Sequence, residues 1–322
     1  MDIRELVGNE FIKTQLLMSA AGAIKRNEAI PHTMFEGIPG SGKTTFSKTL
    51  AETVNTLFFQ EDPNNIKSFK DIEKIASKFP LQGYDEDGNI VEKILPSIVF
   101  IDEIHNLSLK GQEVLGIAME EWSIPGGGKF DGGRIPIPRF TLIGATTLIG
   151  KLSKPFADRF KLSFKFKAYN MIDSTKVVLF HAKRLGVLID LNAAVSIARR
   201  GRGTPRILVR FLERIIDYAN YIAAEKISIG VAETAFAMLG VDAAGLDDND
   251  RRLLECLFDN DNEAVGLDTL AILTGESPFT VANTIEPYLI QNGFMLRTQK
   301  GRTITDKGHK YIKSIKNNLR TT

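Results

Sequence analysis

The run from Gly37 to Thr44, Gly-Ile-Pro-Gly-Ser-Gly-Lys-Thr, constrains the fold more than any other part of the chain. It fits the pattern G-x-x-x-x-G-K-[ST], in which glycines let the backbone turn so that successive N–H groups point at phosphate oxygens. Lys43 would reach the β- and γ-phosphates and Thr44 would ligate Mg²⁺. The run therefore predicts an ATP site, with an ordinary glycine-rich turn as the alternative. The residues expected at the phosphates are Gly37, Pro39, Gly40, Ser41, Gly42, Lys43, Thr44 and Thr45.

The flanking sequence has the strand and the helix that such a loop needs. Residues 32–37 are typical of a short buried strand, and residues 44–57 of a helix. Strand-length apolar runs return at 97–101 and 140–144, and helical spacing of apolar residues at 11–24 and 111–122. Strands that alternate with helices favour an α/β fold, with a parallel sheet covered on both faces.

Two carboxylates follow the strand predicted at 97–101. Asp102 and Glu103 come directly after Ile98-Val99-Phe100-Ile101. Downstream of a phosphate loop, this placement predicts that Asp102 holds the Mg²⁺ shell and that Glu103 orients and polarises the attacking water. His105 has no Cys or His partner at metal-ligand spacing, so we expect a structural or coupling role for it. The single cysteine, Cys256, lies among leucines and is expected in a core.

After about residue 170 the pattern becomes helical throughout. Helical periodicity covers 173–185, 192–200, 205–224 and 232–239. The acidic run from Gly245 to Asp250 indicates a domain boundary. Beyond it, helical patterns at 251–258, 267–273 and 278–291 precede a possible hairpin of 294–298 with 303–305, which is typical of a winged helix. The predicted domains are 1–170, 171–244 and 245–322.

Charge and composition bound the partners and the compartment. From Met295 to the end the chain has eight basic residues and one acid, a net +7, while the rest is −5. This asymmetry favours a polyanion at one end, or else only a solvated helix face. One cysteine excludes an intramolecular disulfide. The acidic N-terminus is unlike a secretory signal, and apolar runs fall short of the ~18 residues of a membrane helix. We expect a cytoplasmic protein.

Taken in order, these motifs resemble the AAA+ ATPases, and more narrowly the RuvB family of Holliday-junction branch-migration motors. The matching stretches of the first part are 37–44, 101–105, 144–147 and 203–206. Those of the tail are 245–247, 250–255, 265–270, 286–291 and 297–302. The resemblance implies an AAA+ P-loop domain with a parallel sheet, a small helical lid and a C-terminal winged helix. It also implies a hexameric ring that hydrolyses ATP to move duplex or four-way-junction DNA in recombination and repair.

The resemblance also implies roles for residues outside the phosphate loop. Thr147 would sense the γ-phosphate, with Thr146 beside it, and Arg159 would be an arginine finger for a neighbouring subunit's ATP. Arg206 would be a second sensor, acting within its own subunit. The catalytic set is thus Lys43, Glu103, Thr147, Arg159 and Arg206. Tyr169 and Pro205 would pack against adenine, and the wing would meet DNA through Arg297, Lys300 and Arg302.

Several segments depart from the family pattern. The chain begins just before Leu6, without the short Arg-Pro stretch that usually precedes it, and Leu148 replaces the usual arginine. The segment 54–97 is longer than the corresponding segment of the family and contains the polar turn 84–89. The segment from Trp122 to Phe140, where RuvB docks its partner RuvA, is shorter and has glycines at 126–128 and 132–133. A glycine-rich hairpin cannot present the same apolar face, so the sequence leaves a RuvA-like loader open.

Two other functions fit parts of this pattern. One is an ATP-dependent loader or initiator, in which nucleotide switches the state of an assembly bound to DNA without processive movement. The tail, which resembles RuvB and not the collar of a loader, argues against this function. The other is a DNA-binding regulator with a vestigial ATPase. A decayed site would be expected to lose at least one of its charged residues, yet Lys43, Asp102, Glu103, Arg159 and Arg206 are all present. The sequence therefore favours a working ATPase.

Overall fold

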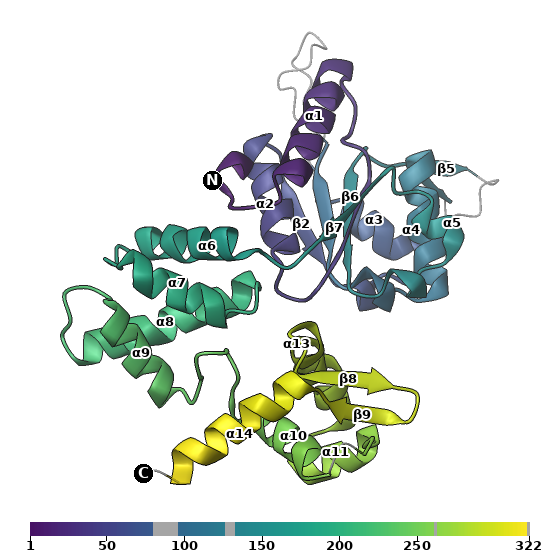
Figure 1. Ribbon diagram of the computed structural model, residues 1–322. Helices are drawn as coiled ribbons and strands as arrows, with labels where there is room; N and C mark the ends of the chain where they lie inside the picture. The colour runs from purple at the N-terminus through teal and green to yellow at the C-terminus, as the bar shows by residue number, and fades with distance from the viewer. Residues whose placement is uncertain (80–95, 126–132, 261–262, 321–322) are drawn as a thin grey trace. The chain divides into compact units, whose positions relative to one another are not determined.

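The computed structural model describes residues 1–79, 96–125, 133–260 and 263–320. They form two compact units, 1–169 and 170–322, which are treated one at a time (Figure 1). Unit 1 carries the phosphate loop, and unit 2 carries the lid helices and the winged helix.

Unit 1 is built on a five-stranded parallel sheet in the order β2-β3-β6-β1-β7. This order confirms the predicted parallel α/β fold and places β6 between β1 and β3. The sequence did not predict the two edge strands, β2 and β7. The strands are β1 (Thr33–Gly37), β2 (Phe58–Glu61), β3 (Ile98–Ile101), β6 (Thr141–Thr146) and β7 (Leu162–Phe166).

The helices of unit 1 begin and end where local residues allow. Helix α2 starts at Lys43, directly after the phosphate loop, and stops at Thr53, because Asn55 takes a left-handed φ of 53° before the chain enters β2. Helix α4 starts after Ser108, whose side chain accepts a hydrogen bond from the Gly111 N–H. The helices are α1 (Glu10–Arg26), α2 (Lys43–Thr53), α3 (Phe69–Ala76), α4 (Leu109–Glu121) and α5 (Lys154–Ala157), with 3₁₀ turns at Ile3–Glu5, Pro63–Asn65, Ile104–Asn106 and Ile149–Lys151.

Both faces of this sheet are covered, as Figure 1 shows. Successive residues of β3 enter different cores: Val99 packs in the cluster of α3, α4 and α5, while Phe100 packs in that of α1 and α2. All four residues of β3 are buried for this reason. Each such large side chain contributes about 1.5–3 kcal/mol of burial free energy. The rigid sheet fixes the positions of the loops at its carboxyl edge.

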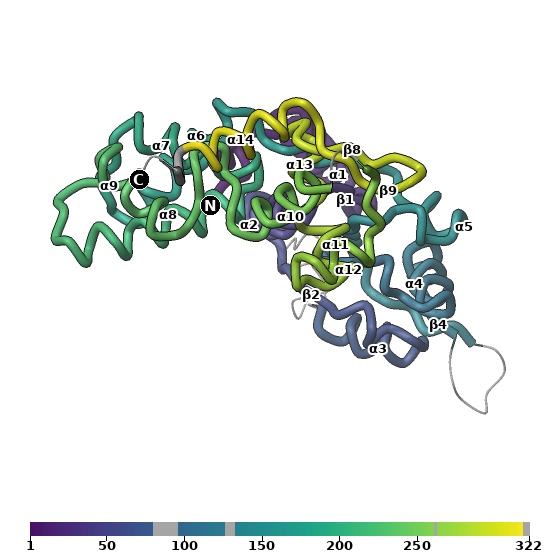
Figure 2. Tube along the Cα trace, turned by 60° about the horizontal axis from the view of Figure 1, so that its bottom comes forward, coloured from purple at the N-terminus to yellow at the C-terminus, as the bar shows by residue number. Residues whose placement is uncertain are grey.

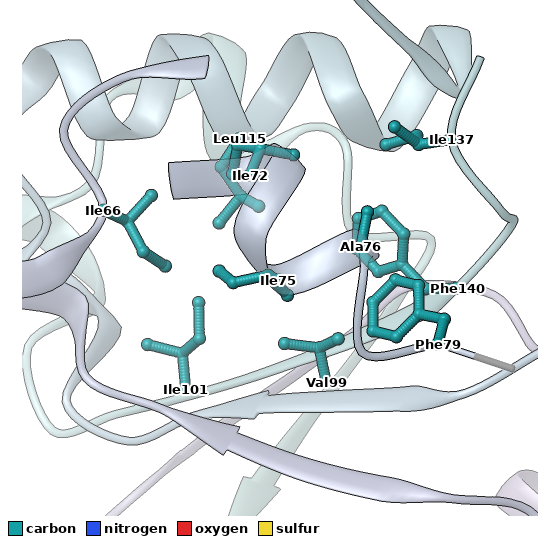
Figure 3. Close-up of a pocket in the computed structure, with 10 residues that line it drawn as sticks. All are labelled: Ile66, Ile72, Ile75, Ala76, Phe79, Val99, Ile101, Leu115, Ile137 and Phe140. Atoms are coloured by element: carbon teal, nitrogen blue, oxygen red, sulfur yellow. The ribbon is translucent and has the colours of Figure 1, made fainter. Parts of the chain in front are cut away.

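The cavity drawn in Figure 3 is a small packing gap under α3. It encloses about 10 Å³ among apolar side chains, close to the smallest space that holds one water. No polar side chain lines it, so it offers nothing to hold a nucleotide. Its lining residues are Ile66, Ile72, Ile75, Ala76, Phe79, Val99, Ile101, Leu115, Ile137 and Phe140.

The segment from Trp122 to Phe140 forms a short antiparallel hairpin, β4 (Ser123–Pro125) with β5 (Arg134–Pro136). Ile124 is buried, whereas Ile135 is 40% exposed. The glycines expected at 126–128 and at 132 lie outside the described residues, as does the polar turn 84–89.

The first half of unit 2 is the predicted group of helices. Helix α6 begins after Asn170, whose side chain accepts from the Asp173 N–H, and α8 begins with Pro205 in its first turn, where proline is favourable. The helices are α6 (Met171–Arg184), α7 (Leu191–Arg200), α8 (Pro205–Tyr221) and α9 (Ile229–Met238).

The second half of unit 2 is a winged helix, in which three helical segments lie with the β8–β9 hairpin (Figure 2). The helix predicted at 278–291 is broken by a π-helical turn at Val281–Ile285, next to Pro287, which has no N–H to donate within the helix. Cys256 is half-buried against this core, where burial raises the pKa of its thiol. The elements are α10 (Asp248–Asp259), α11 (Leu267–Thr274), α12 (Pro278–Thr280), α13 (Glu286–Gln291), β8 (Met295–Thr298), β9 (Gly301–Ile304) and α14 (Asp306–Arg320).

Across the described ranges, each helix is too short or too polar to cross a membrane.

Candidate nucleotide and DNA sites

The phosphate loop has the backbone shape that its motif requires. Gly37, Gly40 and Gly42 have φ angles of 153°, 75° and 98°, which side chains disfavour. A Cβ on Gly37 would lie 2.6 Å from the Phe166 carbonyl oxygen of β7, so this position has no room for another residue. The Lys43 Nζ donates to the Gly37 and Ile38 carbonyls at 2.8 and 3.0 Å. The loop and its lysine therefore lie together at the start of α2.

The residues at this loop fit a phosphate and a magnesium ion. The Ser41 Oγ is buried and, among the residues described, has no hydrogen-bond partner, a costly state that a phosphate oxygen would relieve. Thr44 and Asp102 are half-buried at the ends of the elements that carry them. One hydroxyl and one carboxylate suit Mg²⁺, which keeps waters and substrate phosphates in its shell. No group of three or more His, Cys, Asp or Glu in the described part of the chain forms a larger metal site.

The ends of β3 and β6 bring Glu103 to the predicted sensor. Ile101 of β3 pairs with Gly144 of β6, so the loops that follow these strands are neighbours. The Thr147 hydroxyl donates to Glu103 Oε2 at 3.2 Å. The Glu103 backbone is left-handed, with φ 45°, an uncommon conformation that aims its side chain across the sheet edge.

His105 joins the same group. Its Nδ1 lies 3.2 Å from Glu103 Oε2 and 2.9 Å from Thr146 Oγ1, which also accepts from the Leu148 N–H. The ring contacts both strand ends, in keeping with the coupling role expected for it.

Arg159 lies flat on α4. Its Nη1 donates to the Pro155 carbonyl at 2.7 Å and its Nη2 to Glu120 Oε2 at 3.0 Å. A Cβ on Gly116 would meet the Arg159 Cζ at 3.1 Å, so this glycine makes room for the guanidinium. The Arg159 Nε is buried, and no partner for it is present in the described part of the chain.

An open hollow of about 430 Å³ surrounds Arg159. Four cationic side chains and three carboxylates line it, and two of the cations are paired there, Arg26 with Glu28 and Arg159 with Glu120. Its lining residues are Arg26, Glu28, Ala29, Ile30, Pro31, His32, Met119, Glu120, Trp122, Arg139, Asp158, Arg159 and Lys161.

Tyr169 closes unit 1 against the N-terminal segment. Its hydroxyl donates to the Val7 carbonyl and accepts from Asn9 Nδ2, both at 3.1 Å. A Cβ on Gly8 would lie 2.7 Å from the Tyr169 ring. The ring that the resemblance assigns to adenine thus packs against Gly8 of the N-terminal segment.

Pro205 and Arg206 lie in unit 2, on the first turn of α8. Pro205 is half-buried and Arg206 is exposed. The turn before them contains Arg202, with a left-handed φ of 55°, and Gly203, with φ 61°.

The three basic residues of the wing differ in exposure. Arg297 and Lys300 are exposed. Arg302 is 7% exposed, and its Nε donates to Glu286 Oε1 at 2.6 Å. Its backbone is also bonded in both directions to Val265 at 2.9 Å. The expected DNA contact of Arg302 is therefore corrected: its guanidinium is neutralised inside the winged helix and holds β9 against α13.

Sequence reasoning missed Glu286, Glu120 and Arg202. A weak signal marked the first of these, because Glu286 stands beside the apolar series Val281, Ile285 and Leu289 in a helix that must face the core. The other two carry no local signal, since their partners are distant in sequence.

Three family models together match most of this chain, from residue 1 to residue 313. Residues 1–166 match the Holliday junction DNA helicase RuvB P-loop domain. Residues 169–242 match the RuvB AAA lid domain, and residues 243–313 match the RuvB C-terminal winged helix domain.

Individual proteins are similar over nearly their whole length. The Holliday junction branch migration complex subunit RuvB of Orientia tsutsugamushi (strain Ikeda) is 37% identical over 96% of this chain and 93% of its own. The protein of the same name from Fusobacterium nucleatum subsp. nucleatum is 37% identical over 97% of this chain and 91% of its own. The solved structure of the Thermotoga maritima RuvB Holliday junction branch migration motor superimposes with a TM-score of 0.79, at 31% identity, over 97% of both chains. The chain belongs to the RuvB family of AAA+ P-loop ATPases.

Proposed function

We propose that this protein is an ATP-driven DNA motor whose subunits assemble into a hexameric ring. The ring would move duplex DNA and drive branch migration of four-way junctions during recombination and repair in the cytoplasm. One observation carries the proposal: the P-loop, lid and winged-helix matches follow one another from residue 1 to residue 313. They also support the three-part division at 1–170, 171–244 and 245–322.

Hydrolysis would be carried by the group at the sheet edge. Bound Mg²⁺ would neutralise charge on the phosphate oxygens. Lys43, Thr44 and Asp102 would hold the phosphates and that ion, while Glu103 would orient a water and accept its proton. The Thr147 hydroxyl, which donates to Glu103, would turn toward the γ-phosphate when one is present. Tyr169 and Pro205 would enclose the adenine, and Arg206 would reach the γ-phosphate from the lid.

Arg159 would complete the site of a neighbouring subunit. Its place in an open hollow supports a role toward a group that comes from outside this chain, and its Nη2 would then exchange the exposed Glu120 for a phosphate oxygen. Assembly would then be required for turnover, because the finger and the phosphate loop that it serves belong to different subunits.

The DNA contact would be made by the exposed basic residues of the wing, Arg297 and Lys300. Arg302 is excluded from this role by its bond to Glu286. A RuvA-like loader would meet the β4–β5 hairpin, where Ile135 is an exposed apolar side chain. The names of the relatives, subunits of a branch migration complex, support such a partner.

Two measurements on the purified chain test the proposal. ATP turnover is followed with and without a synthetic four-way junction, and strand exchange in that junction is followed in parallel. Electron microscopy gives the symmetry of the particles. A six-fold ring that is stimulated by the junction and moves its branch point supports the motor. Turnover without branch movement would favour a loader or initiator, and a monomer without turnover would favour a DNA-binding regulator.

A further inference from the structure

The boundary between the lid helices and the winged helix in unit 2 is packed rather than loose. Arg202, in the turn between α7 and α8, has a side chain only 15% exposed. Its Nη2 donates to the Gly245 carbonyl at 2.8 Å and also to Asp250 Oδ2. Its guanidinium lies 4.1 Å from the centre of the Tyr288 ring. One lid residue therefore contacts the connecting segment and two helices of the winged helix, α10 and α13.

The carboxylate that Arg202 meets is itself fixed. Asp250 is 1% exposed, and it accepts from the Asp247 N–H at 3.0 Å as part of the capping box that starts α10. A buried carboxylate is stable only with such partners. The ion pair is therefore attached to the first turn of α10 and not to a mobile surface side chain.

Further contacts hold the connecting segment from both sides. From the lid, the Arg200 Nε donates to the Asp242 carbonyl at 2.8 Å. From the winged helix, the Tyr288 hydroxyl donates to the Ala244 carbonyl at 2.8 Å. A Cβ on Gly245 would lie 3.1 Å from both the Arg200 backbone and the Tyr288 hydroxyl, so the segment has little room to shift.

The turn that carries Arg202 is the turn that presents Arg206. The Thr204 N–H donates to the Gly201 carbonyl at 2.9 Å, and the Thr204 carbonyl accepts from Ile207, so the turn is continuous with α8. Arg202 keeps a left-handed backbone with a φ of 55°, a conformation that is unfavourable for a non-glycine residue. The contacts of its side chain offset that cost.

We propose that Arg202 is a positioning residue that couples the Arg206 turn to the winged helix, so that a nucleotide-dependent shift of Arg206 moves the DNA-binding domain. This inference rests on the proposed function, because it takes Arg206 as the nucleotide sensor. Arg202 touches neither nucleotide nor DNA in this scheme.

The test variant is Arg202→Gly with Asp250→Asn in one chain. Glycine adopts the φ of 55° without strain, and asparagine avoids a buried, unpaired carboxylate. The control is Asp190→Asn, which makes the same carboxylate-to-amide change against Lys226 within the lid, away from the connecting segment. Arg202→Lys is the conservative variant, since it keeps the charge but loses the forked contact.

The first readout is the ratio of junction-stimulated to basal ATP turnover. We expect this ratio to be at least about fivefold lower in the double variant than in the wild type. A factor of about five is the lower end of the typical coupling between two binding sites. Basal turnover and nucleotide-free DNA affinity should stay at wild-type values, whereas a merely structural defect would weaken that affinity. Arg202→Lys should fall between the double variant and the wild type, and Asp190→Asn should match the wild type. Equal stimulation in the double variant, or loss of its DNA affinity, would overturn the proposal.

A second readout does not need DNA. Hydrogen exchange of residues 244–252 is compared with and without a non-hydrolysable ATP analogue. We expect a nucleotide-linked change in the wild type and in Asp190→Asn that is absent in the double variant. If junction DNA fails to stimulate the wild type, the proposed function fails, and this comparison alone decides the coupling. The coupling is rejected if nucleotide does not change the hydrogen exchange of the wild type, or if it causes the same change in the wild type and in the double variant.

Discussion

Lys43 in the phosphate loop and Arg302 in the wing are both cations that the sequence assigned to phosphates, and both are buried, at 6% and 7% exposure. Their surroundings differ. Lys43 contacts carbonyls of its own loop, Gly37 and Ile38, next to the buried Ser41 hydroxyl, which has no partner among the described residues. Arg302 is bonded to the Glu286 carboxylate of another helix. The phosphate-loop lysine therefore lies in the loop that its motif defines, and its role toward ATP stays a prediction, whereas the arginine assigned to DNA is neutralised inside its own domain.

The largest effect should come from Arg159, the other cation assigned by motif. An arginine finger contributes about 10³–10⁵ in rate, so Arg159→Ala should abolish turnover while ATP binding by the single subunit persists. Mixing this variant with Lys43→Ala chains should restore part of the activity, because some interfaces then contain both residues. Absence of recovery at every ratio, with mixed particles verified, would argue against a shared site.

Glu103 should give the next largest effect. Glu103→Gln should lower turnover by about 10²–10⁴, since an amide cannot take a proton from water, and should leave ATP binding intact. Lys43→Ala should lose nucleotide affinity as well. Rapid-quench hydrolysis and equilibrium binding of a fluorescent ATP separate the two. Wild-type turnover by Glu103→Gln would mean that another group activates the water.

The wing should respond through stability rather than through contact. Arg302→Met leaves Glu286 buried and unpaired, which should cost about 3–5 kcal/mol of unfolding free energy. Adding Glu286→Leu should recover most of that loss, because the buried charge is then gone. Urea unfolding of the full chain, followed by circular dichroism, measures both. If Arg302→Met were as stable as the wild type, the ion pair would not hold the wing.

Acid should destabilise unit 1 through His32. Its Nδ1 accepts from the Leu142 N–H and its Nε2 faces the Met119 carbonyl. Burial lowers the pKa of His32 to about 4 from 6.5, so the neutral ring is favoured in the folded state. Its contribution is complete above about pH 6.5 and is lost as pH falls toward 4, by up to about 3 kcal/mol.

Trp122, the single tryptophan, lies 5.5 Å from the His32 ring and reports this unit by fluorescence. The urea concentration at the unfolding midpoint of the wild type should decrease as the pH is lowered from 7 to 4.5. His32→Gln should flatten that dependence, since an amide does not titrate in this range. An unchanged slope in this variant would assign the acid sensitivity to other groups.

The smallest effect should come from the exposed wing residue. If Arg297 touches one phosphate, Arg297→Ala should reduce the slope of log affinity against log salt by about 0.9, equally for unrelated sequences. Arg302→Met with Glu286→Leu should leave the slope unchanged, which separates the two arginines directly. Fluorescence anisotropy on one duplex over a salt series gives both slopes. A smaller slope in the Arg302 variant would restore it as a phosphate contact.

The sequence predicts features that depend on neighbouring residues better than features that depend on residues far apart in the chain. The central strands β3 and β6 are buried along their whole length because both of their faces are covered, and β1 between β6 and β7 is buried over its first three residues. The edge strand β7 alternates, with buried Phe164 and Phe166 separated by exposed Lys165, and this period of two was overlooked. The geometry at Glu103 follows from strand order, which sequence does not give directly.

The ion pairs between residues distant in the sequence could not be predicted from it. Helix packing brings together Arg302 with Glu286 and Arg202 with Asp250. In the sequence, an arginine that will be neutralised in this way cannot be distinguished from one that will stay exposed to water. Segment composition gives the net charge of a domain. It does not say which charges remain available after folding.

Gly116 carries a consequence for engineering. Glycine inside a helix costs about 1 kcal/mol relative to alanine, so a search for thermostable variants would select alanine in the middle of α4. Here the added methyl would occupy the space 3.1 Å from the Arg159 guanidinium. A library ranked by melting temperature alone would therefore enrich variants in which Arg159, the proposed arginine finger, must shift from its place on α4.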